Sequence, residues 1–304
     1  MKNTFIINSL KLLVIVACFS FLYFNIDKDL VIKVFQEINS DYILPSIIFF
    51  SIYMMVYTIF IFKIYDYLYP SKLKLSSWIK IFINGNFLNS IPFLGFVYKG
   101  YRLTNYKISI KDYLFANVFI SWLAISIFFL VFSLEIIFLV TPKISIFDIP
   151  VFLILLFISF LAFTSPKIAS FILSNLKIKI DIINSLLFFL QKRFSKKIIK
   201  HYLSYGLILH TCIFLTYFFI IKLLNIPIGL KIIIVIFLIN EIIDSIPMPN
   251  NNLFITEILG GITATFVGVG FTEFVLIKFT FRIIHLLIII PIFVILNIAF
   301  KSEL

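Results

Sequence analysis

The sequence predicts an all-α protein, a polytopic helical membrane bundle of about eight spans. Of its 304 residues, 62% are hydrophobic and 13% are charged, and the mean hydropathy is +1.13. Soluble domains are about 45–50% apolar and about 25% charged. The apolar runs are long and rich in Ile, Leu and Phe, without the alternation of barrel strands. This composition excludes a soluble enzyme, a secreted disulfide module and a disordered tail, and helices satisfy their own backbone groups in lipid.

The basic residues outnumber the acidic ones, 26 to 14, for a net charge of +12. In a membrane protein, the positive-inside rule and anionic headgroups explain such an excess, so we expect no nucleic-acid partner. The two cysteines, Cys18 and Cys212, are too few for a disulfide framework or a Cys-rich metal site. We therefore expect neither a metal nor a cofactor.

The first predicted span is Ile6–Ile26. Its apolar run continues past Cys18, which favours a membrane helix over a signal peptide. Asp27–Asn39 is a short amphipathic stretch with more acid than base, and Ile43–Phe62 is the second predicted span.

A basic segment follows the second span and contains a semi-apolar piece, Trp78–Tyr98. If this piece crossed the bilayer, the basic residues after it would lie outside, against the charge rule. We therefore expect a re-entrant segment, broken at Pro92 and Gly95, with both ends in the cytoplasm. The basic residues are Lys63, Lys72, Lys74, Lys80, Lys99, Arg102, Lys107 and Lys111.

Tyr113–Val140 and Ile149–Thr164 are the third and fourth predicted spans. The second basic segment follows, and its centre, Ile178–Leu190, is expected to lie on the cytoplasmic interface as an amphipathic helix. The basic residues of this segment are Lys167, Lys177, Lys179, Lys192, Arg193, Lys196, Lys197 and Lys200.

Four helices are expected in the last third of the chain. Tyr202–Leu224 and Leu230–Ile246 are the fifth and sixth predicted spans, and Leu253–Val267 is a shorter helix. A turn at Gly268-Val269-Gly270 leads into Thr272–Phe300, which would be about 43 Å long and must tilt or protrude.

The two basic segments share one side of the membrane when both termini are cytoplasmic. We therefore expect a bacterial or archaeal cell (inner) membrane protein, N-in and C-in. Residues 1–304 form a single integral membrane domain, with candidate halves at 1–165 and 166–304.

An internal sequence similarity between residues 86–92 and 241–247 indicates an inverted repeat of broken helices. Both segments end in Ser-Ile-Pro and enter the membrane from opposite sides in the predicted topology. Such repeats mark the substrate sites of many transporters; the alternative is coincidence in an Ile-rich sequence. The polar residues one and four places before the serine are Asn86 and Asn89 in one segment, and Glu241 and Asp244 in the other.

The expected helix breaks, at Pro92, Gly95, Pro247 and Pro249, would free backbone carbonyls that persist in lipid only beside protein or water. Nearby asparagines could meet these carbonyls or a lipid headgroup, or they could simply cap helices. They are Asn84, Asn86, Asn89 and Asn250–Asn252.

Lys278, Arg282 and His285 are spaced i, i+4 and i+7, which places them on one face of the last helix. An isolated charge at the bilayer centre costs at least about 2.5–3.5 kcal/mol, so it usually faces a partner or a wet cavity. The two interpretations are a structural ion pair and a phosphate clamp, for which the planar fork of arginine is suited. The candidate partners are Glu241, Asp244 and Glu257. No Walker loop, zinc-protease His pair or nucleophile elbow occurs, so we do not expect an enzyme.

These features resemble the transmembrane region of lysylphosphatidylglycerol synthases, which also occurs alone in flippase-like membrane proteins. The similar parts are Pro92–Gly95–Arg102, and Pro249 to Glu257 followed by Arg282. The chain departs from the family pattern at Phe96, at Asn250-Asn251 and around Ser121-Trp122. It has no soluble aminoacyl-transferase domain, so the resemblance does not imply lysyl transfer.

The expected function is to bind and translocate a phosphate-bearing lipid, such as a phospholipid or a polyprenyl-phosphate-linked sugar. Arg282 and Lys278 would attract the phosphate, and Arg102 would serve at the cytoplasmic mouth. One alternative is a non-catalytic scaffold whose partner is a separately encoded, soluble or membrane-associated transferase. Another is a membrane-embedded lipid transferase, with Asp244 or His285 as its base.

Overall fold

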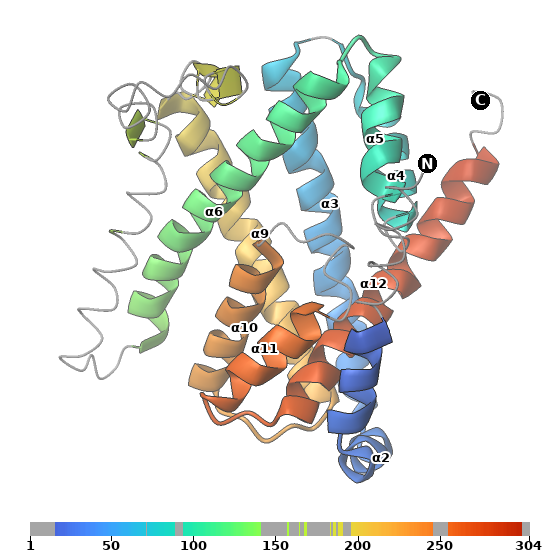
Figure 1. The fold of residues 1–304 in the computed structure, drawn as a ribbon, viewed down its shortest axis with the longest axis vertical. Coiled ribbons are helices and arrows are strands. Elements are labelled where there is room, and N and C mark those ends of the chain that lie inside the picture. The colour runs from blue at the N-terminus through green and yellow to red at the C-terminus, as the bar shows by residue number, and fades with distance from the viewer. Residues whose placement is uncertain are drawn as a thin grey trace. The chain divides into compact units, whose positions relative to one another are not determined.

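A computed structural model describes residues 16–70, 72–88, 94–140, 196–245 and 255–299, and isolated positions between 157 and 190. Every regular element in these residues is a helix, which confirms the all-α prediction (Figure 1). After a first helix at Val16–Asn25, the elements are α2 (Lys28–Gln36), η1 (Ser40–Tyr42), α3 (Ile43–Leu68), α4 (Leu75–Leu88), α5 (Leu94–Thr104), α6 (Ile110–Val140), α9 (Lys196–Leu223), α10 (Leu230–Ser245), α11 (Ile255–Thr265) and α12 (Phe271–Ala299).

Three of the described helices are long and apolar enough to cross a membrane. They are Ser40–Leu68, Tyr202–Leu223 and Phe271–Ile298, with mean hydropathies of 2.1, 1.9 and 2.5. These three support a membrane protein. The expected span Ile149–Thr164 falls almost wholly outside the described residues, as does the start of the first span, and the expected interfacial helix Ile178–Leu190 is described only in part.

Short-range polar contacts fix several helix ends close to their predicted positions. Asp27 caps α2, because its side chain accepts hydrogen bonds from the backbone N–H groups of Asp29 and Leu30. Before α12, Gly268 has a positive φ of 85°, which glycine adopts readily. Glu273, in the first turn of α12, then accepts a hydrogen bond from the N–H of Gly270 at 3.0 Å.

The described helices belong to two compact units that are interleaved along the chain. Unit 1 comprises the described parts of Met1–Ile52, Ile83–Phe96 and Cys212–Leu304, and unit 2 those of Tyr53–Phe82 and Val97–Thr211. Each unit therefore combines segments from both candidate halves of the sequence.

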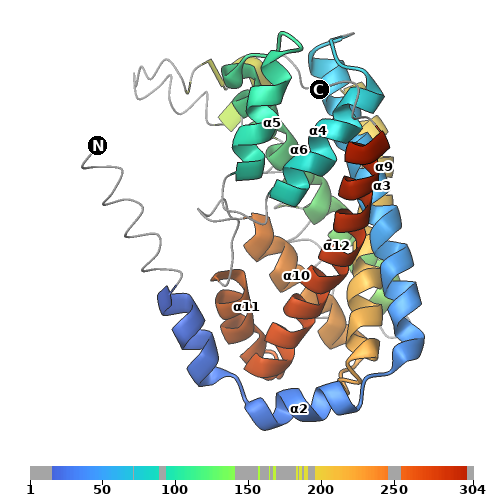
Figure 2. The ribbon, with the colours of Figure 1, turned by 90° about the vertical axis from the view of Figure 1, so that its right-hand side faces the viewer.

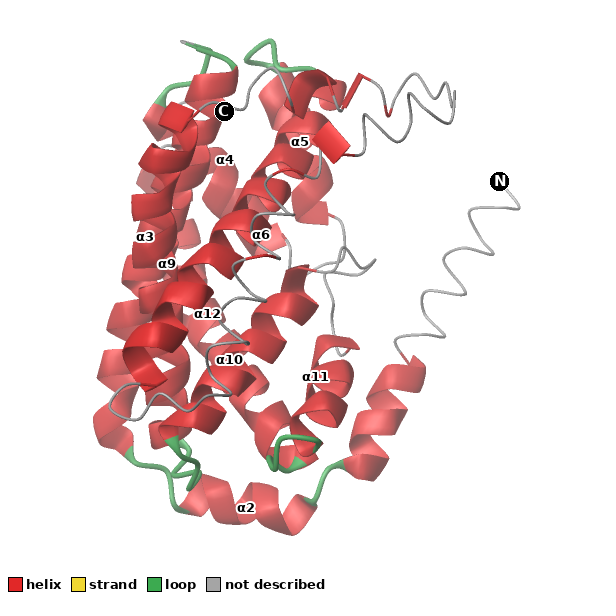
Figure 3. Ribbon diagram, turned by 90° about the vertical axis from the view of Figure 1, so that its left-hand side faces the viewer, coloured by secondary structure: helices red, strands yellow, loops and turns green. Residues whose placement is uncertain are grey.

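The core of unit 1 forms around α12. The ring of Phe281 stacks on Tyr217 of α9, with centroids 4.8 Å apart, and meets the edge of Phe50 of α3 at 5.0 Å. Phe274 and Ile277 of α12 are fully buried. These contacts come from the apolar faces of three long helices, whose packing and hydrogen bonds stabilise a bundle in lipid. In Figures 2 and 3, α11 lies alongside the first half of α12.

Unit 2 has an aromatic core in which several polar side chains are held by specific hydrogen bonds. The indole Nε1 of Trp78 donates to the backbone oxygen of Thr58 at 3.0 Å, and the ring lies 5.0 Å from that of Tyr65. Asn117 donates to the backbone oxygen of Tyr113 at 2.7 Å and to the hydroxyl of Tyr65 at 3.4 Å. These partners satisfy polar groups that would otherwise be expensive to bury.

Candidate functional site

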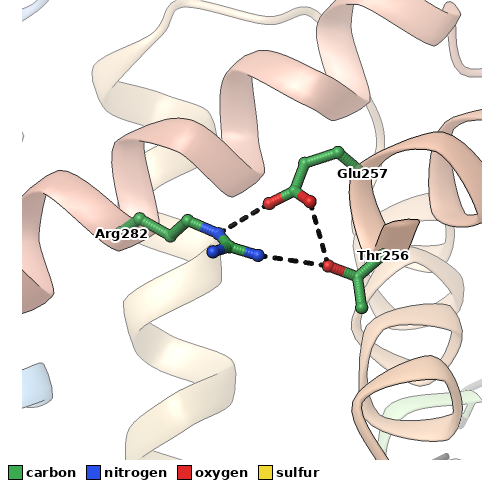
Figure 4. A network of polar contacts seen from close by, with 3 residues as sticks. All are labelled: Thr256, Glu257 and Arg282. Carbon is green, nitrogen blue, oxygen red and sulfur yellow. Dashed lines mark hydrogen bonds and ion pairs between the residues drawn. The ribbon is translucent and has the colours of Figure 1, made fainter. Parts of the chain in front are cut away.

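The central feature of the candidate site is an ion pair between α12 and α11 (Figure 4). The Nε of Arg282 lies 2.6 Å from Oε1 of Glu257. One terminal nitrogen of Arg282 donates to the hydroxyl of Thr256 at 3.3 Å, and that hydroxyl donates to Oε2 of Glu257 at 3.1 Å. The three side chains form a closed ring of contacts. Of the three predicted carboxylate partners for Arg282, the structure brings Glu257 to it.

The two charges of this pair differ strongly in burial. The Glu257 side chain is 1% exposed, whereas the Arg282 side chain is 32% exposed. In Figure 4, the second terminal nitrogen of Arg282 points away from Glu257 and Thr256. The carboxylate is thus buried, and the Arg282 side chain keeps part of its surface exposed.

The start of α11 favours a carboxylate at Glu257. This residue lies in the first turn of α11, where the helix dipole is positive and stabilises an acidic side chain. Close packing holds this short helix against the start of α12. A Cβ added at Gly261 would lie 2.6 Å from the ring of Phe271, so only glycine fits there without a shift. Gly260 and Ala264 are also buried, and these small residues allow the close approach.

The other members of the predicted basic face lie one turn to each side of Arg282. Lys278 is buried, with 4% of its surface exposed. The ring of His285 is half-buried and lies 5.5 Å from that of Phe50. Two cations one turn apart, one of them fully buried, make this stretch of α12 the most basic part of a long apolar helix. Because α12 is helical throughout this stretch, Lys278, Arg282 and His285 lie on one face of it, as the spacing predicts.

The remaining predicted residues lie on other helices or outside the described residues. Arg102 belongs to unit 2, in the last turn of α5, with its guanidinium carbon 5.8 Å from the Tyr98 ring. Gly95 is the second residue of α5, and Asn86 is half-buried in the last turn of α4. Glu241 and Asp244 lie in the last turns of α10. Asn89, Pro92, Pro247, Pro249 and Asn250–Asn252 lie outside the described residues, so both expected proline breaks do too.

Unit 1 contains a second polar contact, between two asparagines, that was not predicted from the sequence. The amide of Asn297 on α12 donates to Oδ1 of buried Asn84 at 3.1 Å, and Asn84 donates back at 3.5 Å. Beside them, the rings of Phe87 and Phe293 stack with centroids 4.0 Å apart. Asn297 interrupts an apolar run, and this feature of the sequence could have indicated that the residue has a polar partner. Thr256 was also missed, although it directly precedes Glu257.

The chemistry available at the site is electrostatic. Among the residues that the structure describes, no group of three or more His, Cys, Asp or Glu side chains is placed to hold a metal ion. The Arg282–Glu257–Thr256 ring offers a guanidinium that can exchange partners, and a guanidinium is well matched to phosphate.

Comparison of the chain with protein-family models, with curated proteins and with solved structures finds no match.

Proposed function

We propose that this protein is an integral membrane protein that binds a phosphate-bearing lipid at Arg282 and moves it across the membrane. The lipid would be a phospholipid or a polyprenyl-phosphate-linked sugar. The observation that carries the proposal is the unequal burial of the ion pair: Glu257 is sealed at 1% exposure, while Arg282 keeps 32% of its side chain exposed.

A headgroup phosphate would approach the exposed side of Arg282. The guanidinium has five N–H donors in a planar fork, so it can contact Glu257 and a phosphate at once or pass from one to the other. Lys278, one turn earlier on α12, adds positive charge that offsets the phosphate. Glu257 and Thr256 keep Arg282 satisfied when no lipid is bound, which lowers the cost of holding a cation in an apolar helix.

Lipid binding can be separated from folding with three variants. Arg282→Ala alone leaves the buried Glu257 carboxylate without its cation, so the loss of lipid in that variant is ambiguous. The double variant Arg282→Ala/Glu257→Ala removes both charges and should fold. Arg282→Lys keeps the charge but lacks the planar fork. Ile283→Ala, at an exposed apolar neighbour, is the matched control at the same depth.

The experiment is mass spectrometry of the lipid that co-purifies in mild detergent. The parent protein and Ile283→Ala should retain an anionic, phosphate-bearing lipid in a fixed ratio. The double variant should fold and lose it, and Arg282→Lys should retain part. A folded double variant with the parental amount of the same lipid would reject Arg282 as the phosphate ligand. No retained lipid in any protein would favour a scaffold role.

A further inference from the structure

A short amphipathic helix, α2, joins the ends of membrane-spanning candidates within unit 1. Before it, the backbone N–H of Asp27 donates to the hydroxyl of Thr272 at 3.0 Å, at the start of α12. After it, the N–H of Asn39 donates to the backbone oxygen of Leu223 at 2.9 Å, at the end of α9. The candidate span that includes α3 begins at Ser40. Both ends of α2 are therefore fixed where three candidate spans begin or end.

The orientation of α2 follows from these attachments. Figures 2 and 3 show α2 along its length, crosswise to the first turns of α3, and Figure 1 shows it end-on. A helix in this position cannot continue a span, and it lies where spans emerge from the hydrocarbon.

The rest of the protein covers only part of the apolar face of α2. At 100° per residue, its five apolar side chains fall within an arc of about 200°, which also contains Lys28 at the first position of the helix. The protein buries Val34, which is 7% exposed, on one flank of this arc. On the other flank, Ile32 and Phe35 are 56% and 55% exposed. The opposite side of the helix carries Asp29, Lys33, Gln36 and Glu37.

Residues next to α2 have the character of a membrane interface. Phe24, at the end of the preceding apolar helix, is 80% exposed. The Nζ of Lys28 lies 4.3 Å from the centroid of the Tyr23 ring, which is itself 54% exposed. Aromatic rings beside a lysine are typical of the headgroup level of a bilayer.

We propose that α2 is an interfacial helix that inserts Phe35 and Ile32 into the boundary between headgroups and acyl chains. By the predicted orientation, this is the outer leaflet, because α3 leads from α2 to the basic cytoplasmic segment. Helices with one apolar face and one charged face lie in this plane. The proposal concerns a surface separate from the Arg282 site and stands without the proposed function.

The charge around α2 indicates what kind of lipid contact it makes. Residues 27–41 carry four acidic side chains and two lysines. Attraction to anionic headgroups therefore cannot be the main contribution to the binding of α2 to the bilayer. The main contribution must come from insertion of its apolar side chains. The depth of α2 should accordingly be the same in neutral and in anionic bilayers, unlike that of a basic amphipathic helix.

Site-directed spin labelling tests the proposal on the full chain. The native cysteines are replaced (Cys18→Ser and Cys212→Ala), and single cysteines are introduced as Phe35→Cys, Ile32→Cys and, as the polar control on the other side of α2, Lys33→Cys. The labelled proteins are reconstituted in phosphatidylcholine vesicles, with and without phosphatidylglycerol. Collision rates are measured with oxygen, which concentrates in the bilayer, and with a water-soluble nickel chelate.

Labels at 35 and 32 should collide preferentially with oxygen and the label at 33 preferentially with the chelate, and none of these ratios should change with phosphatidylglycerol. The labels at positions 32 and 35 report independently. If one of these two variants fails to fold, the other still tests the proposal. Equal chelate access at 35 and 33 would overturn the proposal, since α2 would then lie in water. Low access to both probes at 32 and 35 would also overturn it, because a protein surface would then cover this face. A depth that requires phosphatidylglycerol would contradict the apolar insertion.

Discussion

Removing one charge of the Arg282–Glu257 pair should affect stability very differently from removing the other. Arg282→Ala leaves a carboxylate at 1% exposure with one remaining hydrogen bond, from Thr256 at 3.1 Å. Leaving one partner of a buried pair uncompensated costs about 3–5 kcal/mol. Glu257→Gln leaves the cation instead, but Arg282 is 32% exposed and the new amide oxygen can still accept its hydrogen bond. Glu257→Gln should therefore cost only about 1 kcal/mol, the usual cost of weakening one hydrogen bond whose other partner is still solvated.

The double variant Arg282→Ala/Glu257→Gln completes the cycle. Neither charge remains, so it should be more stable than Arg282→Ala alone, although it carries one more substitution. Interaction energies between contacting residues are about 0.5–3 kcal/mol, and this pair should lie in the upper half of that range.

Unfolding in mixed detergent micelles, followed by circular dichroism, measures all four proteins under one condition. The order of stability should be parent, Glu257→Gln, the double variant and then Arg282→Ala. Equal destabilisation by Arg282→Ala and Glu257→Gln would refute the argument from burial. A double variant no better than the sum of its single substitutions would show that the ion pair makes no net contribution.

Two further predictions concern packing in unit 1. Gly261→Ala places a Cβ 2.6 Å from the Phe271 ring and should destabilise the protein by about 1–3 kcal/mol, whereas Gly229→Ala, with nothing within 4 Å, should cost less because it loses only the glycine preference before the first turn of α10; equal melting temperatures in detergent would contradict this. Asn297→Leu removes the amide pair with buried Asn84 and should cost about 0.6–1.7 kcal/mol, and combining it with Asn84→Leu should recover part of that loss; strictly additive effects would show that the two amides do not interact.

Much of the helical architecture could be predicted from the sequence. The amphipathic stretch Asp27–Asn39 contains α2, and the predicted span Leu230–Ile246 begins at the same residue as α10. These predictions succeed because hydrophobic runs and turn residues determine helix limits locally. The second predicted span, Ile43–Phe62, is shorter than α3, which continues to Leu68. The lysine and aspartate at its end fit on a helix that extends beyond the hydrocarbon, so charge is a poor marker of where a helix stops.

The candidate site could be predicted only in part. The depth of Arg282 in an apolar run predicts a nearby carboxylate, and the preceding helices of the last third of the chain offer three candidates, Glu241, Asp244 and Glu257. Which acid pairs with it depends on how closely α11 approaches α12, and that approach depends on Gly261 against Phe271. The contact between Asn84 and Asn297 joins residues 213 positions apart, and no local pattern specifies such a pairing.

The most direct test of a lipid-moving function at Arg282 is translocation in reconstituted vesicles. A fluorescent phospholipid is placed in both leaflets, and the fraction that dithionite bleaches from outside is followed over time. The parent protein and Ile283→Ala should expose nearly all the fluorophore to bleaching, while the folded double variant Arg282→Ala/Glu257→Ala should leave about half protected, as in protein-free vesicles. A folded double variant that exposes the lipid at the parental rate would contradict the account.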